Sequence, residues 1–565
     1  MKTWEIRVEG IVQGVGFRPT VYALAHQLQL FGTVSNGPEG VKILCSAPES
    51  LAQTFYQRIL SQAPPNAIIT RHSIHESAPK FFESFEILES QHCGTRSLLP
   101  TPDFGICEGC SKELHDPSNR RFGYPFITCT SCGPRYSILK DLPYDRPKTS
   151  MEEFPMCSAC LEEYHDPEDR RHFSQTNSCA TCGVSLSLHT GYRSGLFQGE
   201  NEKIQHYILQ AWRQGKIVAI KGIGGYLLTC DASDEQAIQA LRARKDRPGK
   251  PFALMVPEVS RFDLSNSEER LFNSSVAPIL LVEKPKDLGI ASGVADGLSQ
   301  VGIMRPYAPL FEWLLKPFGK PIVATSANIH QAPILYRDAE IEKLLQIADV
   351  VLSHNREIVV PQDDSVVKIA PASQQAILMR RSRGWAPNYL ETLPQLSVDQ
   401  IWAAGADLKS CMGFIHEKKV YLSQYLGDLS HADTEQHFLD TRRALKRLLQ
   451  FRPKVLLADL HPGYVSTRLA RNWGEENNIE VACIQHHRAH FAAILGEHRL
   501  FDSEDPILGF IWDGTGFGED GNIWGGEGFL YHKSGMKRIG HVAYFPSIAG
   551  DKMAREPRLA ALALL

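Results

Sequence analysis

A repeated pattern of four cysteines constrains this chain more than any other feature of its sequence. The pattern is Cys-x2-Cys-x18-Cys-x2-Cys, and every cysteine of the second copy lies 50 residues after its counterpart in the first. Four thiolates complete the tetrahedral shell of a zinc ion and leave no position for a substrate, so the repeat predicts two structural zinc modules over residues 105–190. Redox-active cysteine pairs are the alternative, but such pairs do not occur as repeated sets of four. The eight predicted zinc ligands are Cys107, Cys110, Cys129, Cys132, Cys157, Cys160, Cys179 and Cys182.

The residues around the two cysteine sets repeat as well. Arg120-Arg121 in the first copy corresponds to Arg170-Arg171 in the second. Residues 107–182 hold nine basic and twelve acidic side chains, and binding to a phosphate backbone needs the opposite sign of charge. We therefore expect the modules to brace the fold or to dock a protein, and we expect no nucleic-acid partner.

The composition is that of a globular chain with several domains. The chain has 565 residues, of which 43% are hydrophobic and 22% are charged, and its net charge is −4. No apolar run approaches the roughly 18 residues of a membrane-spanning helix, and the first residues lack the apolar stretch of a secretory signal. We expect a multidomain α/β (α+β) protein without a membrane segment. We place it in the reducing cytoplasm, where paired cysteines are more often metal ligands than disulfides.

Residues 1–91 are predicted to form one small α/β domain. The alternation over Trp4–Glu9 is typical of a half-buried strand, and the glycine-bearing loop 10–18 leads to a helix that we expect to start near Pro19. Glycines let backbone N–H groups converge on an anion, and Arg18 adds a guanidinium that fits phosphate with two hydrogen bonds. An ordinary turn with a surface arginine is the alternative. Asn36 lies in a second turn, where its side-chain amide is placed to hold a water.

Residues 7–22 and 35–41 resemble the acylphosphatase signature. The resemblance implies a ferredoxin-like fold in which the loop and Arg18 bind the phosphate of an acyl phosphate. It also implies that Asn36 orients the attacking water. The loop residues whose backbone it implies as phosphate ligands are Gln13, Gly14, Val15, Gly16 and Phe17.

Between residues 199 and 387, predicted strands and helices alternate, and polar residues follow several of the strands. A buried strand that ends at Ile220 leads into Lys221, and a second strand delivers Ser326-Ala327-Asn328. Residues 242–250 carry five cations within nine positions. By itself, the run of cations is typical of a solvated helix end, and Ser326-Ala327-Asn328 is typical of an ordinary turn. Together, the cations and the hydroxyl and amide groups suit the binding of a nucleotide triphosphate.

This stretch resembles the YrdC-like family of domains that form an adenylate from a carbamate and ATP. That family binds nucleotide phosphates with a Lys-x-Arg and a Ser-x-Asn, so the resemblance implies this role for Lys245, Arg247, Ser326 and Asn328. The family often continues Ser-x-Asn-x-Ser-Gly, whereas this chain has Ile329-His330-Gln331, and no hydroxyl contact is expected there. Further expected nucleotide contacts are Lys221, Lys250, Arg381 and Arg383.

Residues 395–565 form the last predicted domain. His486 and His490 lie four residues apart, and a helix would put both rings on one face, where they can share a metal ion. Exposed helix histidines are the alternative. The strand over residues 507–512 is expected to end at Asp513, beside glycines.

This last segment resembles the first lobe of the actin/hexokinase-like domain in tRNA threonylcarbamoyl transferases and their carbamoyltransferase relatives. The resemblance implies that His486, His490 and Asp513 hold a divalent metal near a nucleotide. The helical pattern of Leu559–Leu565 stops without a cap. We therefore expect a truncated sequence that lacks most of the second lobe.

The order of the four parts resembles one family over essentially the whole chain, the HypF-type carbamoyltransferases of nickel–iron hydrogenase maturation. The resemblance implies that carbamoyl phosphate is cleaved, that the carbamate is activated by ATP with Mg²⁺, and that the carbamoyl group is transferred to the C-terminal cysteine of the partner HypE. The product is the precursor of the cyanide ligands of the hydrogenase. Because carbamate is unstable in water, we expect the sites to face a shared interior cavity.

Two other functions are open. A tRNA threonylcarbamoyladenosine-type modification enzyme shares two of the four parts, but the acidic balance and the acylphosphatase-like domain argue against it. A zinc scaffold without catalysis would release no pyrophosphate from ATP. These alternatives differ in salt-sensitive tRNA binding and in ATP–pyrophosphate exchange.

Overall fold

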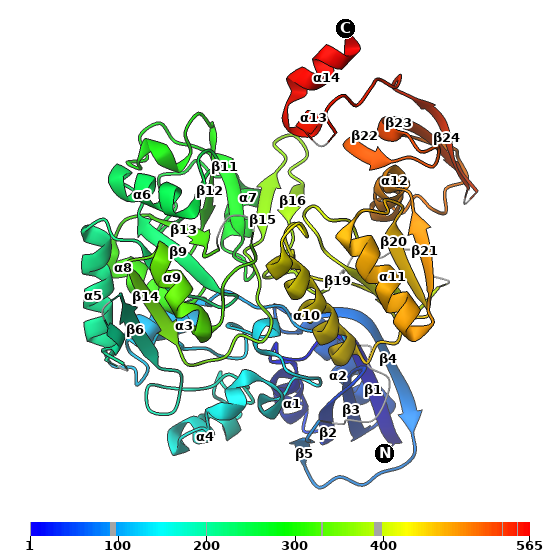
Figure 1. Ribbon diagram of the computed structural model, residues 1–565. Coiled ribbons are helices and arrows are strands. Elements are labelled where there is room, and N and C mark those ends of the chain that lie inside the picture. The colour runs from blue at the N-terminus through cyan, green and yellow to red at the C-terminus, as the bar shows by residue number, and fades with distance from the viewer. Residues whose placement is uncertain are drawn as a thin grey trace. The chain divides into compact units, whose positions relative to one another are not determined.

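The computed structural model describes residues 2–90, 98–191, 193–198, 200–328, 332–388, 398–533, 535–550 and 552–565. The chain divides into two compact units. The first holds residues 1–388, 423–425 and 437–450, and the second holds residues 389–422, 426–436 and 451–565. Sheets of mixed strand direction with flanking helices confirm the predicted multidomain α/β (α+β) class (Figure 1). None of the described helices is long and apolar enough to cross a membrane.

The amino-terminal part of the first unit is a five-stranded sheet with two helices, the predicted ferredoxin-like arrangement. The strand order is β4-β1-β3-β2-β5, and β1 pairs antiparallel with both β3 and β4. Inward residues such as Ile6 and Ile43 are fully buried. Strand β4 has no apolar alternation and is largely exposed, which is why the sequence pattern did not reveal it. The elements are β1 (Lys2–Ile11), α1 (Phe17–Gln27), β2 (Phe31–Gly37), β3 (Gly40–Ala47), α2 (Glu49–Ser61), β4 (Ile68–Ser77) and β5 (Phe85–Ile87).

The cysteine-rich segment that follows has little regular structure. Each cysteine set opens with a short helix directly after its first cysteine, and the second pair follows in a loop. The chain between these points is held by turns, which is expected where metal ligands replace a hydrophobic core. The elements are α3 (Glu108–His115), the 3-10 helices η1 (Tyr136–Ile138), η2 (Arg146–Lys148) and η3 (Ser150–Glu153), and α4 (Ser158–His165).

An eleven-stranded mixed sheet forms the rest of the first unit, in the order β16-β15-β11-β12-β10-β13-β9-β8-β14-β6-β7. Strand β6 pairs with β14, so residues 186–190 at the end of the predicted zinc segment belong to this sheet. Its elements are β6 (Leu186–Thr190), β7 (Arg193–Leu196), α5 (Asn201–Arg213), β8 (Val218–Lys221), β9 (Tyr226–Asp231), α6 (Glu235–Lys245), β10 (Ala253–Met255), α7 (Asn266–Phe272), β11 (Ile279–Glu283), η4 (Ser292–Val294), β12 (Gln300–Met304), α8 (Pro309–Phe318), β13 (Ile322–Ser326), η5 (Asp338–Glu340), α9 (Ile341–Ile347), β14 (Val350–His354), β15 (Val366–Ile369) and β16 (Ala376–Arg380).

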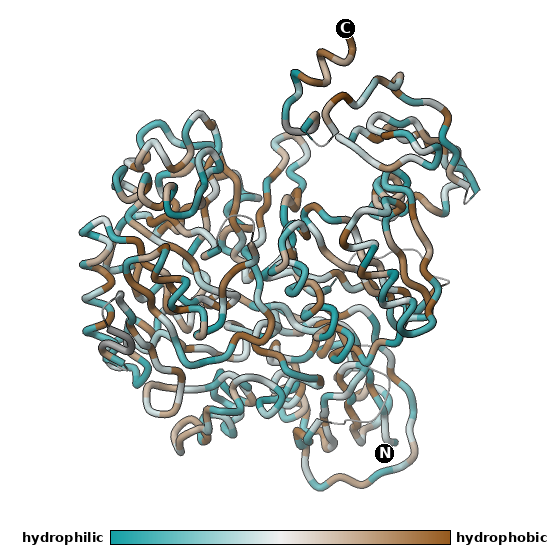
Figure 2. Tube along the Cα trace, viewed as in Figure 1, coloured by the Kyte–Doolittle hydropathy of each residue, from teal (hydrophilic) through white to brown (hydrophobic). Residues whose placement is uncertain are grey.

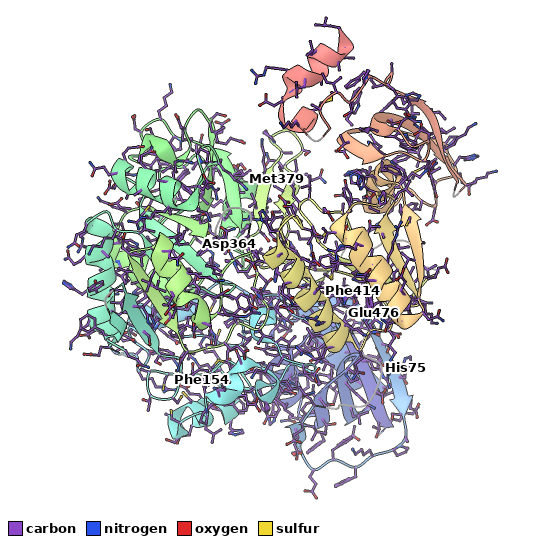
Figure 3. All side chains as sticks on the ribbon, in the orientation of Figure 1. His75, Phe154, Asp364, Met379, Phe414 and Glu476 are labelled. Atoms are coloured by element: carbon purple, nitrogen blue, oxygen red, sulfur yellow. The ribbon has the colours of Figure 1, made fainter. Side chains whose placement is uncertain are left out.

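Two separate cores cover the two faces of this sheet. One contains Trp212 of α5 and Phe311 of α8, and the other contains Leu241 of α6 and Leu344 of α9. The hydrophobic colour in Figure 2 follows the central strands between these helices. Strand β16 lies at the edge of the sheet, where Met379 is 56% exposed (Figure 3).

The second unit contains two sheets. The first has the order β19-β18-β17-β20-β21, with three antiparallel strands followed by two parallel ones, and the second has the order β22-β23-β24. The residues of α10 are divided between the two units. The elements are β17 (Ile401–Ala403), β18 (Gly413–His416), β19 (Lys419–Leu422), α10 (Ala432–Leu449), β20 (Val455–Asp459), α11 (Val465–Asn477), β21 (Glu480–Ile484), α12 (His486–Glu497), β22 (Ile507–Phe517), β23 (Ile523–His532), β24 (Gly535–His541), α13 (Lys552–Arg555) and α14 (Pro557–Leu564).

One predicted strand end is wrong. Strand β22 does not stop at Trp512 but continues to Phe517, and its register against β23 shifts between Trp512 and Gly516. Asp513 therefore lies at an irregularity inside the strand, where the regular pairing with β23 is interrupted and then resumes at Gly516. The segment Ile329–Gln331 and residues 389–397 of the predicted domain boundary lie outside the described residues.

Candidate functional site

The predicted phosphate loop joins β1 to α1 and turns at two glycines. Gly14 and Gly16 have φ angles of +70° and +82°, a region in which only glycine is free of strain. Helix α1 begins at Phe17, two residues earlier than expected. The loop thus ends at a helix N-terminus, where backbone N–H groups without intrahelical partners favour an anion.

Arg18 and Asn36 line the same small pocket, whose cavity volume is about 20 Å³. Both side chains are buried. Arg18 Nη2 donates a hydrogen bond to Asp145 Oδ1 at 3.2 Å, and the guanidinium lies 5.6 Å from the centre of the Phe173 ring. Arg18 therefore already has a carboxylate counterion, with which an anionic ligand has to compete.

The remaining wall of this pocket comes from the cysteine-rich segment, which we call the roof (Thr130, Arg135, Tyr144 and residues 173–175). Arg135 Nε donates to the Gly14 carbonyl at 2.6 Å. The backbone N–H of Tyr144 donates to Gln13 Oε1 at 3.1 Å. The roof packs so closely that a Cβ atom at Gly14 would lie 3.0 Å from Tyr144 Cδ1. Sequence reasoning missed the roof, because no local motif marks residues so far along the chain from the loop.

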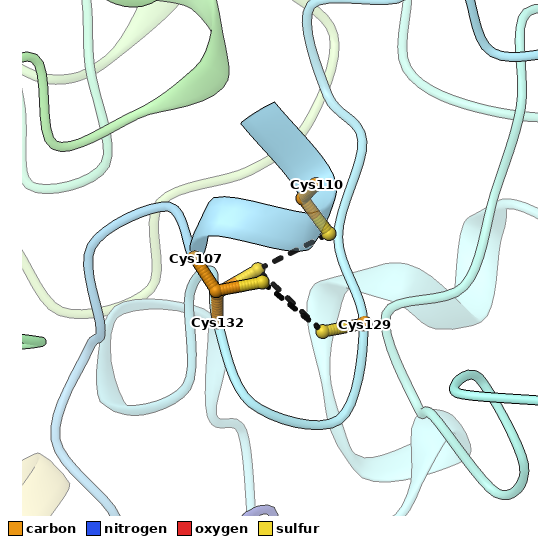
Figure 4. Close-up of side chains that lie close together, drawn as sticks. All are labelled: Cys107, Cys110, Cys129 and Cys132. Atoms are coloured by element: carbon orange, nitrogen blue, oxygen red, sulfur yellow. Dashed lines mark hydrogen bonds between the residues drawn. The ribbon is translucent and has the colours of Figure 1, made fainter. Parts of the chain in front are cut away.

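The four sulfur atoms of each cysteine set lie within 4.8 Å of one another, and Figure 4 shows the first set. In the first set, Cys107, Cys129, Cys132 and Cys110 are joined in that order by Sγ–Sγ distances of 3.7, 3.8 and 3.5 Å. The second set repeats these distances at 3.8, 3.8 and 3.6 Å. A tetrahedral zinc ion with Zn–S bonds of about 2.3 Å needs sulfur atoms about 3.8 Å apart. Both sets therefore fit zinc, as predicted.

The repeated arginine pairs link the two modules to each other. Arg170 of the second module donates to Cys107 Sγ at 3.0 Å and to Cys129 Sγ at 3.3 Å in the first. In the opposite direction, Arg120 donates to Cys160 Sγ at 3.2 Å. Burial alone would lower the pKa of Arg170. The negative charges of the nearby thiolates outweigh this effect, so that the pKa of Arg170 is raised. Four thiolates around a divalent zinc leave two negative charges, and each module supplies cations that offset those of the other.

Matching carboxylates complete the link between the modules. Glu113 of the first module receives hydrogen bonds from Arg170 and Arg171. Glu163 of the second receives them from Arg120 and Arg121. The modules therefore form one interlocked body.

Three of the predicted nucleotide ligands meet at one point. Lys245, at the end of α6, donates from Nζ to the Ser326 carbonyl at 2.6 Å, to the Asn328 carbonyl at 3.0 Å, and to Asn328 Oδ1. The resemblance to the YrdC-like family implies that Lys245 and the Ser-x-Asn turn share a site. Burial, followed by repulsion from Arg247, lowers the pKa of Lys245 to about 7.

Arg247 and Lys250 extend this cluster. Arg247 Nη1 donates to Thr325 Oγ1 at 3.2 Å, and its Nε donates to the Lys250 carbonyl at 3.2 Å. Burial, together with the charges of Arg242 and Arg380, lowers the pKa of Arg247 to about 10. Sequence reasoning missed Arg380, which lies next to the two arginines that were predicted.

The other three residues that were predicted to contact the nucleotide are Lys221, Arg381 and Arg383, and each donates hydrogen bonds to residues outside the Lys245 cluster. Lys221 Nζ donates to Asp338 Oδ1 at 2.7 Å. Arg381 Nη2 donates to the Trp385 carbonyl at 2.9 Å. Arg383 is fully buried, donates to Asp364 at 2.8 Å, and lies over the Tyr307 ring; Asp364 is labelled in Figure 3.

The second unit brings the predicted histidines and aspartate together. His486 Nε2 and His490 Nε2 lie 3.1 and 3.6 Å from Asp513 Oδ2. The other ring nitrogen of His486 contacts Asp459 at 2.7 Å, a residue that sequence reasoning missed. Hydrogen bonds with Asp459 and then Asp513 raise the pKa of His486 to about 9. Two imidazoles and a carboxylate, with a further carboxylate that orients one ring, suit a divalent transition metal.

Models of known families match nearly the whole chain. They are acylphosphatase over residues 4–87, the HypF finger over 106–139 and 156–189, and a family described as telomere recombination over 210–382. The HypF Kae1-like domain matches residues 397–497. The second subdomain of the carbamoyltransferase Kae1-like domain matches residues 509–565.

Full-length relatives agree with these matches. Carbamoyltransferase HypF of Synechocystis sp. is 42% identical over 570 residues, which covers 100% of this chain and 73% of the relative. Carbamoyltransferase HypF2 of Cupriavidus necator is 40% identical over 586 residues, or 99% and 71% of the two chains. The crystal structure of full-length HypF in the phosphate- and nucleotide-bound form has a TM-score of 0.92 at 38% identity, covering 100% of this chain and 73% of that one.

Proposed function

The chain belongs to the HypF family of carbamoyltransferases, and on this basis we propose that it cleaves carbamoyl phosphate, activates the carbamate with ATP and transfers the carbamoyl group to a protein thiol. The observation that carries the proposal is the pocket in which Arg18 and Asn36 meet the N-terminus of α1. A pocket with a guanidinium, converging N–H groups and an amide for water suits hydrolysis of an acyl phosphate. We also propose that the chain acts in the cytoplasm, where thiol ligands stay reduced.

In the first step, a water held by Asn36 attacks the phosphorus of carbamoyl phosphate. The bond between phosphorus and the oxygen of the carbamoyl group breaks, carbamate leaves with the electron pair, and the proton of the water passes to the phosphate. Arg18 and the backbone N–H groups of residues 13–17 hold the phosphoryl oxygens as charge develops. Positioning and electrostatic stabilisation supply most of the rate advantage, because phosphoryl transfer asks for little covalent chemistry from the protein.

In the second step, a carbamate oxygen attacks the α-phosphorus of ATP. The bond to the β-phosphate breaks, and carbamoyl-adenylate and pyrophosphate form. Lys245 and Arg247 are positioned to hold phosphate oxygens, with Lys250, Ser326 and Asn328 beside them. Mg²⁺ bound with ATP supplies further charge neutralisation.

In the third step, the carbamoyl group passes from the adenylate to a thiolate, and AMP leaves. Membership of the family implies the C-terminal cysteine of HypE as the acceptor, and the cyanide ligands of nickel–iron hydrogenase as the later product. His486, His490 and Asp513 would hold a divalent metal in the unit that belongs to the transfer domain. Asp459 orients His486 for that purpose.

We further propose that carbamate passes inside the protein from the first site to the second, since it decomposes in water. Mixing a variant without phosphate release with a variant without adenylation tests this step. At low protein concentration the mixture should recover little activity. Full recovery would show that carbamate travels through solvent.

The test of the whole relay is ATP–pyrophosphate exchange that depends on carbamoyl phosphate, measured together with phosphate release. Arg18→Ala should lower both by about 100-fold or more, because one lost oxyanion donor costs this much. Lys245→Ala should remove the exchange and leave phosphate release within about twofold. Arg71→Ala and Lys286→Ala, which remove exposed cations, are the controls. Exchange without carbamoyl phosphate in the wild type contradicts the relay.

A further inference from the structure

Two hydroxyl groups in the roof of the phosphate pocket have no hydrogen-bond partner among the described residues. They are Tyr144 Oη and Ser174 Oγ, and both atoms are buried from solvent. Their side chains are only 4% and 2% exposed, and both residues line the pocket that contains Arg18 and Asn36. A buried polar group without a hydrogen-bond partner is destabilising, so a bound ligand is the natural partner for the pair.

Neutral side chains line the pocket together with Arg18. Phe173 and Val12 contribute apolar walls to the same pocket. Burial raises the pKa of Tyr144, which keeps its phenol protonated and able to donate. The pocket therefore offers two neutral hydroxyls besides the guanidinium of Arg18, and the guanidinium of Arg135 lies 5.7 Å from the Tyr144 ring.

We propose that Tyr144 and Ser174 recognise the carbamoyl group of the substrate and select it over other acyl groups. This inference rests on the proposed hydrolysis of carbamoyl phosphate at Arg18. A carbamoyl group offers one carbonyl oxygen, which accepts hydrogen bonds, and one NH₂, which donates them. A phenol is the stronger donor and an aliphatic hydroxyl the better acceptor, so Tyr144 donates to the carbonyl oxygen and Ser174 accepts from the NH₂.

This assignment explains why the pocket needs the cysteine-rich segment. The phosphate loop belongs to residues 13–18, but the groups that read the acyl end come from the zinc modules. Ser174 lies between Cys160 and Cys179, in a turn where its backbone N–H donates to the Arg171 carbonyl at 2.8 Å. The interlocked arginines and the zinc-binding thiolates hold this turn against the loop. The cysteine-rich segment, which the metal ions stabilise, thus supplies the two side chains that select the acyl group of the substrate.

The test compares carbamoyl phosphate with acetyl phosphate, which has the carbonyl but a methyl group in place of NH₂. Phosphate release is measured with the full chain. Ser174→Ala should lower kcat/KM for carbamoyl phosphate about tenfold, since a lost hydrogen bond costs about 1.4 kcal/mol, and should leave acetyl phosphate within twofold. Tyr144→Phe should lower kcat/KM for both substrates, because both carry the carbonyl.

Two controls remove unpaired buried hydroxyls of the same segment that do not line the pocket, Tyr136→Phe and Ser150→Ala. They should change neither substrate. Loss of an unpaired hydroxyl does not remove an internal contact, so all four variants should fold and retain two zinc ions. Inhibition by inorganic phosphate reports on binding at Arg18 and should be the same in Ser174→Ala as in the wild type.

The outcomes separate this inference from the function on which it rests. If the wild type releases phosphate from neither substrate, the proposed hydrolysis is wrong. If the wild type is active and Ser174→Ala leaves the ratio of the two kcat/KM values unchanged, or if Ser150→Ala changes it equally, the assignment of Ser174 is wrong.

Discussion

The two predicted phosphate sites of the first unit prepare for an anion in opposite ways. In the acylphosphatase-like pocket, the buried Arg18 is paired with the carboxylate of Asp145. At the nucleotide cluster, the hydrogen bonds of Lys245 go to backbone carbonyls and an amide oxygen. The first site is electrically compensated before it binds, by a carboxylate that is hydrogen-bonded to its arginine, whereas the second gathers several cations near Asp363, a carboxyl group whose pKa is raised by burial.

The consequences follow from the cost of burying charge. Cations that are buried close together disfavour each other's charged form, and the pKa of Lys245 is accordingly lowered to about 7, by burial first and Arg247 second. A polyphosphate relieves this repulsion, so the cluster gains most from a ligand of high charge. The compensated pocket gains less from charge alone, and it selects its ligand by shape and hydrogen bonds from the roof.

The largest expected difference between the sites comes from removing a metal ligand of the second zinc module, which supplies residues 173–175 of the roof. Cys179→Ser should lose one zinc ion and lower phosphate release by about 100-fold, because a shift of roughly 1 Å in a binding group costs this much. ATP affinity should stay within about threefold. Zinc content, phosphate release and calorimetric titration with an ATP analogue measure the three effects.

Cys230→Ser provides the control for this substitution, since Cys230 is a buried cysteine of β9 outside both metal sets. It should keep both zinc ions and full phosphate release. If Cys179→Ser loses its zinc but still releases phosphate at the wild-type rate, the roof does not depend on the module.

The next effect is a difference in pH dependence. Lys245 has to be protonated to hold a phosphate, and its pKa of about 7 lies below the ordinary value of 10.5. Above pH 7, nucleotide binding must therefore take up a proton, and ATP affinity should fall by up to about tenfold per pH unit. Phosphate inhibition at Arg18 should not share this fall, because arginine stays charged.

Titration with a nonhydrolysable ATP analogue and Mg²⁺ between pH 6 and 9 measures this dependence. In Lys245→Gln the affinity should be weaker and nearly independent of pH. An equally steep fall in Lys245→Gln would assign the titration to another group.

Sequence reasoning found the two phosphate sites unequally, for a physical reason. The loop at Gly14 and the Ser-x-Asn turn at Asn328 are local motifs, and local geometry decides what they can bind. Tyr144, Ser174 and Asp145 have no such motif, since they reach the loop only through the folding of the zinc modules. The pairing of Arg170 with the thiolates of the other module shows the same limit. The repeat is visible in the sequence, but the sequence does not show that the arginines of each module bond to the thiolates of the other.

The fold was predicted more completely than the contacts within it. Apolar periodicity identified several helices and strands, among them α2, α10 and β8. It missed β4, whose polar side chains lie exposed at a sheet edge, and it ended β22 too early at Trp512. In the second unit the spacing of His486 and His490 indicated that they can share a ligand, and the resemblance to the actin/hexokinase-like domain joined Asp513 to them. Its orienting carboxylate, Asp459, comes from a parallel strand and needed the structure.

A smaller effect is expected from breaking the exchange of arginines between the modules. Arg170→Ala removes charge-assisted hydrogen bonds to Cys107 and Cys129. The first module should release zinc to a chelator about tenfold faster, which corresponds to roughly 1.4 kcal/mol for a hydrogen bond to a charged group. Phosphate release should stay within about twofold, because the carbonyl of residue 170 that accepts a hydrogen bond from Thr130 of the roof belongs to the backbone and is kept in the variant.

Arg120→Ala should labilise the zinc of the second module in the same assay, since Arg120 contacts Cys160. Arg58→Ala, on α2, is the control. Equal release rates in Arg170→Ala and Arg58→Ala would mean that the exchanged arginines do not stabilise the metal sites.

The smallest effect tests the compensation of the first site directly. Asp145→Asn removes a negative charge 3.2 Å from Arg18 and keeps an oxygen that can accept the same hydrogen bond. Since the Asp145 side chain is 23% exposed, solvent screens the pair, and the gain for an anion should be about 1 kcal/mol. Inorganic phosphate should therefore inhibit about fivefold more tightly, while ATP affinity stays unchanged. Asp141→Asn, in the same segment and paired with Lys148, should leave phosphate inhibition as it is. Weaker inhibition in Asp145→Asn would mean that the carboxylate holds Arg18 in place for the ligand more than it competes with it. The two phosphate sites would then differ in how their cations are positioned, and not in how their charge is balanced.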